Sequence, residues 1–277
     1  LLFTNWTTRL CATTITVKAD GWIQPITNFY GCSNNIATNP PLEMSNRVHL
    51  IARDLVVESG GYIDANGKGY RTDNTANKAI AYGPGAGAST GNRGFGGSHG
   101  GLASIGYVQG GTFYMYRRTD TGPAYDDTNA PLAPGSSGGY AYQPGPGGGP
   151  GGGAILLKAT NVTVNGTIRA DGGAGANQYG GGGSGGAIYI TCVTFGGSNG
   201  VISAKGGARS SSNTNGGGAG GRIAVNYVSL VSRGIQFSTE PGLEHGEALV
   251  CPSQMGTVWL PDTAMLTTNL TQFNGVR

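Results

Sequence analysis

Acid–base catalysis needs carboxylates gathered on one face of a fold beside a basic partner, and the sequence contains two acidic groups to consider. The first falls in a glycine- and proline-rich stretch that predicts a loop, and the second lies beside Pro241 and Gly242, which predict a solvated turn. Catalysis remains the alternative for each, but we expect neither group to be catalytic. The groups are Asp126 with Asp127, and Glu240, Glu244 and Glu247 around His245.

His99 is the most conspicuous single residue, because it follows Ser98 and precedes two glycines. Its imidazole could act in catalysis, or it could hydrogen-bond two turns of backbone together. We favour the structural role. No phosphate-binding loop, dinucleotide-binding glycine motif or calcium-binding nonapeptide is present, so we expect no cofactor.

The four cysteines include no C-x-x-C pair, and no histidine stands at metal-ligand spacing, so we expect no metal site. Four cysteines allow three disulfide connectivities. The simplest one keeps each closed loop within one end of the chain, and four free buried thiols are the alternative. The two candidate disulfides are Cys11 to Cys32 and Cys192 to Cys251.

Four N-x-S/T sequons permit N-glycosylation, although roughly three would arise by chance in a chain this rich in Asn, Ser and Thr. The second and third are close together, and both asparagines would have to face solvent to carry glycans. The candidate residues are Asn5, Asn161, Asn165 and Asn269.

Glycine dominates the composition, with 54 residues among 277. The glycines lack the every-third-residue spacing of collagen, and apolar β-branched runs separate their clusters, so we expect a folded chain and not a disordered one. Charged residues make up 11% and the formal net charge is +3, which is too dilute for a nucleic-acid groove. No run of about 18 apolar residues exists, so we expect no membrane insertion. Without a Met start or a signal peptide, the chain looks like a mature or excised piece.

Two linked sequence patterns recur along the chain. The first is G-x-I-x-A-x-G, found at residues 61–67, 166–172 and 200–206, and the second is a glycine cluster that leads into a strand, as at residues 151–157 and 185–190. The glycine cluster appears once more before Ile223. Equivalent isoleucines are 33 residues apart from Ile155 to Ile188, 34 from Ile168 to Ile202 and 35 from Ile188 to Ile223, so the unit has about 34 residues.

One such unit cannot bury its own apolar face, whereas stacked units can. The sequence therefore predicts an all-β fold, specifically a right-handed parallel β-helix (solenoid) with long glycine-rich loops and terminal caps. An antiparallel sandwich or barrel is the competing interpretation. We expect the glycines to turn corners at positive φ and to allow close stacking. With His99, the structural positions are Gly61, Gly67, Gly153, Gly166, Gly172, Gly186, Gly200, Gly206 and Gly221.

The predicted organisation has three parts. Residues 1–45 form an N-terminal cap, residues 46–230 form the glycine-rich β-helix with loop insertions at about 70–150, and residues 231–277 form C-terminal strands and a cap. We interpret the insertions as loops that protrude from poorly marked coils. Their tyrosines form either a contact surface or a cover for the coil. They include Tyr107, Tyr114, Tyr116, Tyr125, Tyr140 and Tyr142.

In this order, the motifs resemble a family of glycine-rich β-helix domains of large secreted proteins, including flagellar-hair (mastigoneme) proteins. The resemblance spans about residues 48–260 and rests on residues 63–69, 97–101, the glycine cluster before Ala154, both later G-x-I-x-A copies and residues 256–260. It implies a non-enzymatic, extracellular structural protein that self-associates or contacts neighbouring domains, with possible covalent glycans. A carbohydrate-binding or polysaccharide-degrading β-helix is the alternative function.

Overall fold

The computed structural model describes most of the chain as β-strands joined by extended segments. It contains no helix within these residues, and so none that could cross a membrane. The described residues are 1–26, 47–72, 80–90, 93–104, 106–109, 112–115, 121–140, 147–210, 215–242 and 252–266.

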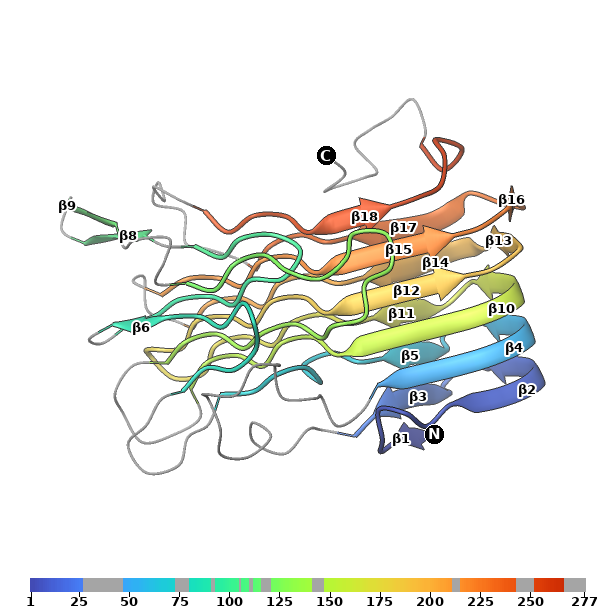
Figure 1. Cartoon of the computed structure of the whole chain (residues 1–277), viewed down its shortest axis with the longest axis horizontal. Helices are drawn as coiled ribbons and strands as arrows, with labels where there is room; N and C mark the ends of the chain where they lie inside the picture. Colours follow the sequence, from blue (N-terminus) through green and yellow to red (C-terminus); the bar gives the residue numbers. More distant parts are fainter. Residues whose placement is uncertain are drawn as a thin grey trace.

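Two parallel sheets face each other across one core (Figure 1). The six-stranded sheet has the order β1 (Leu2–Phe3), β3 (Trp22–Pro25), β5 (Tyr62–Asp64), β11 (Thr167–Arg169), β14 (Ser198–Ser203), β17 (Gly234–Ser238). The eight-stranded sheet contains β2 (Leu10–Val17), β4 (Val48–Val57), β10 (Ala154–Val164), β12 (Ala187–Thr191), β13 (Thr194–Gly196), β15 (Arg222–Asn226), β16 (Ser229–Leu230) and β18 (Thr257–Trp259).

Residues that the repeat makes equivalent are register partners in these sheets. Ile188 pairs with Ile155 on one side and with Ile223 on the other, and Ile168 pairs with both Ile63 and Ile202. The prediction of parallel strands is therefore confirmed, and the antiparallel sandwich is wrong. Among the described residues, antiparallel pairing occurs in two short ribbons, β6 (Ser89–Thr90) with β7 (Arg93–Gly94) and β8 (Gly106–Gln109) with β9 (Thr112–Met115), and in the isolated bridge between Tyr140 and Gly180.

The core consists of rows of aliphatic side chains, in which register partners on adjacent strands, such as Ile155, Ile188 and Ile223, stack on one another. We call these rows aliphatic ladders. In β10, the core side chains Ile155, Leu157 and Val162 are at most 2% exposed, whereas Lys158 is exposed. Full burial of a residue of this size stabilises the fold by about 1.5–3 kcal/mol, and the cluster includes residues of both sheets.

The glycine-rich segments form a second packed region, which extends from the strands to the left of Figure 1. Three successive backbone N–H groups in such a segment donate to three different neighbouring segments. Every third N–H group donates to the same neighbouring segment. This is the periodicity of a polyproline II helix, which has three residues per turn and no internal hydrogen bonds. From 181 to 186, the donors in order reach the carbonyls of Gly139, Gly216, Gly173, Ser136, Ala219 and Ala170, at 2.7 to 3.0 Å.

Close backbone approach explains why these segments are glycine. A Cβ on Gly182 would lie 1.9 Å from the carbonyl oxygen of Gly207, and one on Gly186 would lie 2.0 Å from that of Gly153. No side chain fits at such a distance without displacing the neighbouring backbone. We call this hydrogen-bonded array of glycine-rich segments the glycine lattice.

The expected use of glycine at positive φ is largely wrong. Of the described glycines, only Gly60, Gly67 and Gly83 have positive φ, and Gly67 (φ 58°) is the only one of the predicted structural positions among them. A Cβ at any of the other predicted positions would come within 2.0 to 3.0 Å of a heavy atom. The chain therefore needs glycine mainly for close approach, which does not require the left-handed region. These positions are Gly61, Gly153, Gly166, Gly172, Gly186, Gly200, Gly206 and Gly221.

Parts of the region at about 70–150 are packed and not protruding loops. Residues 94–99 and 134–140 are buried, and they exchange hydrogen bonds with residues 181–186 in the glycine lattice. Tyr140 is 2% exposed, so it cannot belong to a contact surface. The sequence could not predict this packing because these segments carry few apolar side chains whose pattern would reveal it. The side chains of Tyr107, Tyr114, Tyr116 and Tyr142 lie outside the described residues.

Candidate functional site

His99 lies inside the glycine lattice and is completely buried. Its Nδ1 is 2.8 Å from the carbonyl oxygen of Gly185, and because a carbonyl only accepts, Nδ1 donates. Its Nε2 is 3.4 Å from Oδ2 of Asp126, and its ring stacks at a tilt on Tyr125 with centroids 4.6 Å apart. The imidazole thus joins three segments that are distant in sequence.

Asp126 fixes the loop that follows it. Its Oδ2 accepts the N–H groups of Leu132 and Ala133 at 2.9 and 2.8 Å, and its backbone has φ 71°, a left-handed conformation that Asp tolerates better than most residues. The N–H of Asp127 donates to Oδ1 of Asp126, and its own Oδ1 accepts the N–H of Asn129, each at 2.9 Å. Asp126 therefore acts as the anchor of residues 126–133.

Tyr125 extends this cluster toward the strands. Its hydroxyl donates to the carbonyl of Pro134 at 2.6 Å and accepts from Ser136 Oγ at 2.9 Å, and burial raises its pKa well above the usual value. Its carbonyl accepts from Nε of Arg222 at 2.7 Å, and burial lowers the pKa of that guanidinium. Such hydrogen bonds hold residues 121–136 against the outer side of β15 and the lattice. The hydrogen bonds of this arrangement run mainly to backbone groups, so its evident role is to position the backbone of residues 121–136.

The second acidic group is only partly described. Glu240 pairs with Lys205, whose Nζ is 2.8 Å from Oε2. The other members, Glu244, His245 and Glu247, lie outside the described residues. Within the described ranges, no three His, Cys, Asp or Glu side chains converge to hold a metal ion.

Two of the cysteines are described, and both carry free thiols. Cys11 is exposed on β2, whereas Cys192 is buried, which raises the pKa of its thiol to about 12. The expected partners Cys32 and Cys251 lie outside the described residues, but the free thiols of Cys11 and Cys192 mean that neither predicted disulfide is formed in this structure.

The sequon asparagines have different surroundings. Asn161 uses both amide atoms, because Nδ2 donates to Oδ1 of Asp54 and Oδ1 accepts from Oγ1 of Thr194, each at 2.6 Å. Asn165, in the turn between β10 and β11, uses Oδ1 to accept the N–H of Ser198 at 2.7 Å. The exposed Asn5 accepts from Thr7, and Asn269 lies outside the described residues. The repeat could have revealed the Asp54, Asn161 and Thr194 ladder, since its members occupy equivalent positions.

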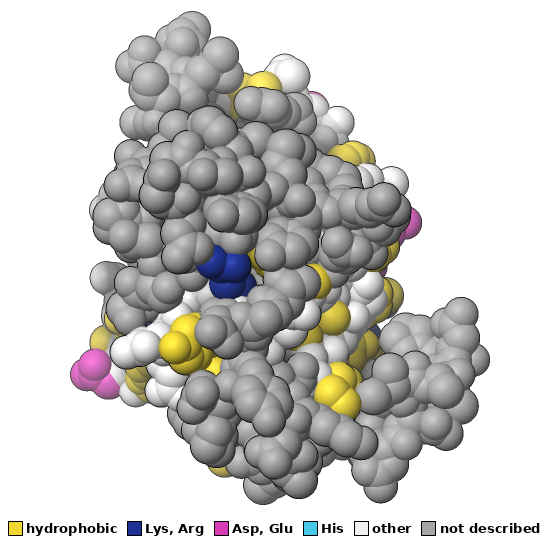
Figure 2. All heavy atoms as spheres, turned by 90° about the vertical axis from the view of Figure 1, so that its left-hand side faces the viewer, with side chains coloured by type: hydrophobic (Ala, Val, Ile, Leu, Met, Phe, Trp, Pro, Cys, Tyr) yellow, Lys and Arg dark blue, Asp and Glu magenta, His cyan; other side chains and the backbone are white. Residues whose placement is uncertain are grey.

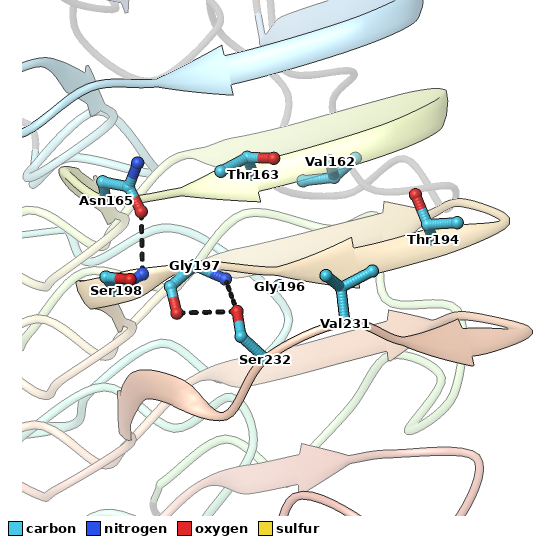
Figure 3. Close-up of a pocket in the computed structure, with 9 residues that line it drawn as sticks. All are labelled: Val162, Thr163, Asn165, Thr194, Gly196, Gly197, Ser198, Val231 and Ser232. Atoms are coloured by element: carbon cyan, nitrogen blue, oxygen red, sulfur yellow. Dashed lines mark hydrogen bonds between the residues drawn. The ribbon is translucent and has the colours of Figure 1, made fainter.

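A shallow pocket of about 220 Å³ lies beside Asn165, where the turns of three successive repeats meet (Figure 3). A Cβ on Gly196 would lie 2.7 Å from Oγ of Ser232, and both residues line the pocket, which combines hydroxyl groups with the exposed Val231. Ser232 closes one side by exchanging hydrogen bonds with the backbone of Gly197 at 2.7 and 2.9 Å. The volume is below the roughly 300–1,000 Å³ of sites for drug-sized ligands, so only a small group fits.

Figure 2 shows the end of the molecule where the glycine-rich segments lie, at the left of Figure 1. The described side chains visible there are mostly uncharged. Comparison with protein families, with curated proteins and with solved structures gives no match for this chain.

Proposed function

We propose that the chain is a right-handed parallel β-helix that serves as an extracellular structural unit of a filament or surface appendage. The observation that carries the proposal is the in-register parallel pairing of successive repeats, in which the outermost of the described strands of each sheet pair on one side only. Solenoids of this kind bury a continuous core only by stacking, and a further stacked copy continues the same pattern.

The open edges support self-association. Among the described strands, β1 and β17 end one sheet, while β2 and β18 each have one partner in the other. An unpaired edge offers N–H and C=O groups to another chain. Leu1, which precedes β1, and Leu2, the first residue of β1, are 62% and 55% exposed, which adds apolar surface at that end.

Assembly by the edges can be tested by sedimentation and electron microscopy of the purified chain. Leu2→Lys places a charge at an end of the stack and should prevent polymer formation, because charged side chains blunt edge strands. Val193→Lys is the matched control, since Val193 is 47% exposed at a middle repeat, and it should still polymerise. A wild-type chain that stays monomeric at every concentration overturns the proposal.

Carbohydrate binding is the second candidate, and an aromatic cluster on the six-stranded sheet favours it. Trp22, 42% exposed, stacks on Tyr62 with centroids 4.4 Å apart, and the guanidinium of Arg169 lies 5.6 and 5.5 Å from the two rings. Asp64 pairs with Arg169 at 2.8 Å. Exposed aromatic rings beside charged hydrogen-bonding groups suit a sugar ring, and loss of saccharide binding in Trp22→Ala tests this candidate.

A further inference from the structure

Positive charge gathers around His49, near the beginning of β4. Val48 and Leu50 point into the core, so His49 points to the outer side of the sheet. His49 is nevertheless only 8% exposed, and neither ring nitrogen has a hydrogen-bond partner. Buried polar side chains are normally paired, so this histidine requires an explanation.

Three cations surround this histidine. Arg47 precedes it by two residues on the same strand face, Arg9 lies beside it because Leu10 is the register partner of Leu50, and Lys158 lies on β10, whose Leu156 is the partner of His49. Strands β2, β4 and β10 are neighbours in the sheet (Figure 1). Burial and the charges of Arg47, Lys158 and Arg9 lower the pKa of His49 to about 4.

Within the part of the chain that the structure describes, none of these cations has a carboxylate partner. The ion pairs of the described residues use other side chains, namely Arg53 with Asp54, His99 with Asp126, Arg169 with Asp64 and Lys205 with Glu240. Arg47 is held by its Nε, which donates to the carbonyl of Trp6 at 3.1 Å, while its guanidinium lies 4.7 Å from the centre of the Trp6 ring. That contact orients the guanidinium but leaves its charge uncompensated.

We propose that Arg9, Arg47 and Lys158, together with His49, form a binding site for a small oxyanion, namely a sulfate, phosphate or carboxylate group. Arginine and lysine donate charge-assisted hydrogen bonds to such oxygens, and a neutral imidazole adds one N–H. An anion here also removes the mutual repulsion of three like charges. The proposal is independent of self-association, because the site lies on the outer sheet face and requires no second copy.

The test uses the full chain at constant ionic strength, with chloride replaced stepwise by sulfate, by inorganic phosphate or by glucuronate. NMR follows the His49 ring. The signal should saturate with each bound oxyanion, and the pKa of His49 should rise, because a nearby anion stabilises the imidazolium. Tightest binding of glucuronate assigns an acidic saccharide as the source of the carboxylate, whereas tighter binding of sulfate or phosphate assigns an inorganic anion.

Arg47→Gln and Lys158→Gln should each weaken binding about tenfold, since each removes a charged hydrogen-bond donor. Lys158 is exposed, so its replacement leaves the fold intact. Lys18→Gln removes another exposed cation as the matched control and should leave binding unchanged. A His49 signal that does not saturate, or an equal loss in Lys18→Gln, overturns the proposal.

Discussion

Asn161 donates the hydrogen of its side-chain Nδ2 to Oδ1 of Asp54 at 2.6 Å, although 107 residues separate them. The pair lies on adjacent strands, where Asn161 and Asp54 are register partners. Thr194 continues the same line on the next strand. Polar side chains thus form a ladder outside the sheet that follows the same repeat as the aliphatic ladders inside it.

This ladder predicts a pH dependence. The hydrogen bond from Asn161, followed by that from Arg53, lowers the pKa of Asp54. A carboxyl with a lowered folded-state pKa stabilises the fold fully above its unfolded pKa of about 3.9, and this stabilisation is lost as pH falls through the folded value. Asn161→Ala should therefore raise the pKa of Asp54 in an NMR titration. Thr194→Val, which leaves the Asn161 to Asp54 bond intact, should change it less, and equal effects would contradict the ladder.

Glycan placement gives the second prediction. N-glycosylation uses Nδ2, which Asn161 commits to Asp54, whereas the hydrogen bond of Asn165 uses only its Oδ1. In a chain secreted from eukaryotic cells, we expect Asn165 to carry a glycan and Asn161 to remain unmodified, as measured by glycopeptide mass spectrometry. Thr167→Ala removes the Asn165 sequon and serves as the control. A glycan on Asn161 with Asn165 empty would reverse the assignment.

The glycine lattice predicts that glycine-to-alanine substitutions destabilise the fold by amounts that depend on how closely the neighbouring atoms approach. Gly182→Ala should destabilise the fold by about 3 kcal/mol, at the upper end of overpacking costs, because its Cβ would lie 1.9 Å from the backbone oxygen of Gly207. Gly153→Ala is the comparison, since its closest contacts are Cβ atoms of Ala65 and Lys68 at 3.0 Å, and it should cost less. Denaturant unfolding measures both. Similar stability of the two variants would show that close approach is not what selects glycine here.

The anchor at Asp126 predicts local opening of residues 126–133. Asp126→Ala removes the acceptor of the Leu132 and Ala133 amides, so their hydrogen exchange should accelerate by about tenfold or more. Asp126→Asn keeps an acceptor oxygen and tolerates the left-handed backbone, so it should retain most of the protection. Unchanged exchange in Asp126→Ala would mean that other contacts hold the loop.

The sequence predicted the strands and their register partners correctly where apolar side chains repeat at regular spacing. The alternation around Ile155 and Ile168 marks strands and their inward faces, and the spacing of equivalent isoleucines identifies register partners. Sequence reasoning failed for the partners of His99 and for the cations around His49. Those contacts join segments with no shared spacing, so no local signal links Asp126 to His99 or Arg9 to His49.

The sequence by itself determined the strands, their repeat of about 34 residues and the composition of the core, because burial of apolar side chains follows the two-residue period of a strand. Only the tertiary structure decided how the glycine-rich segments pack, since Gly182 and its neighbours bind through backbone N–H and C=O groups that every residue possesses. A glycine has no side chain to specify its partner. The partner is therefore fixed by the strands that bring the segments side by side.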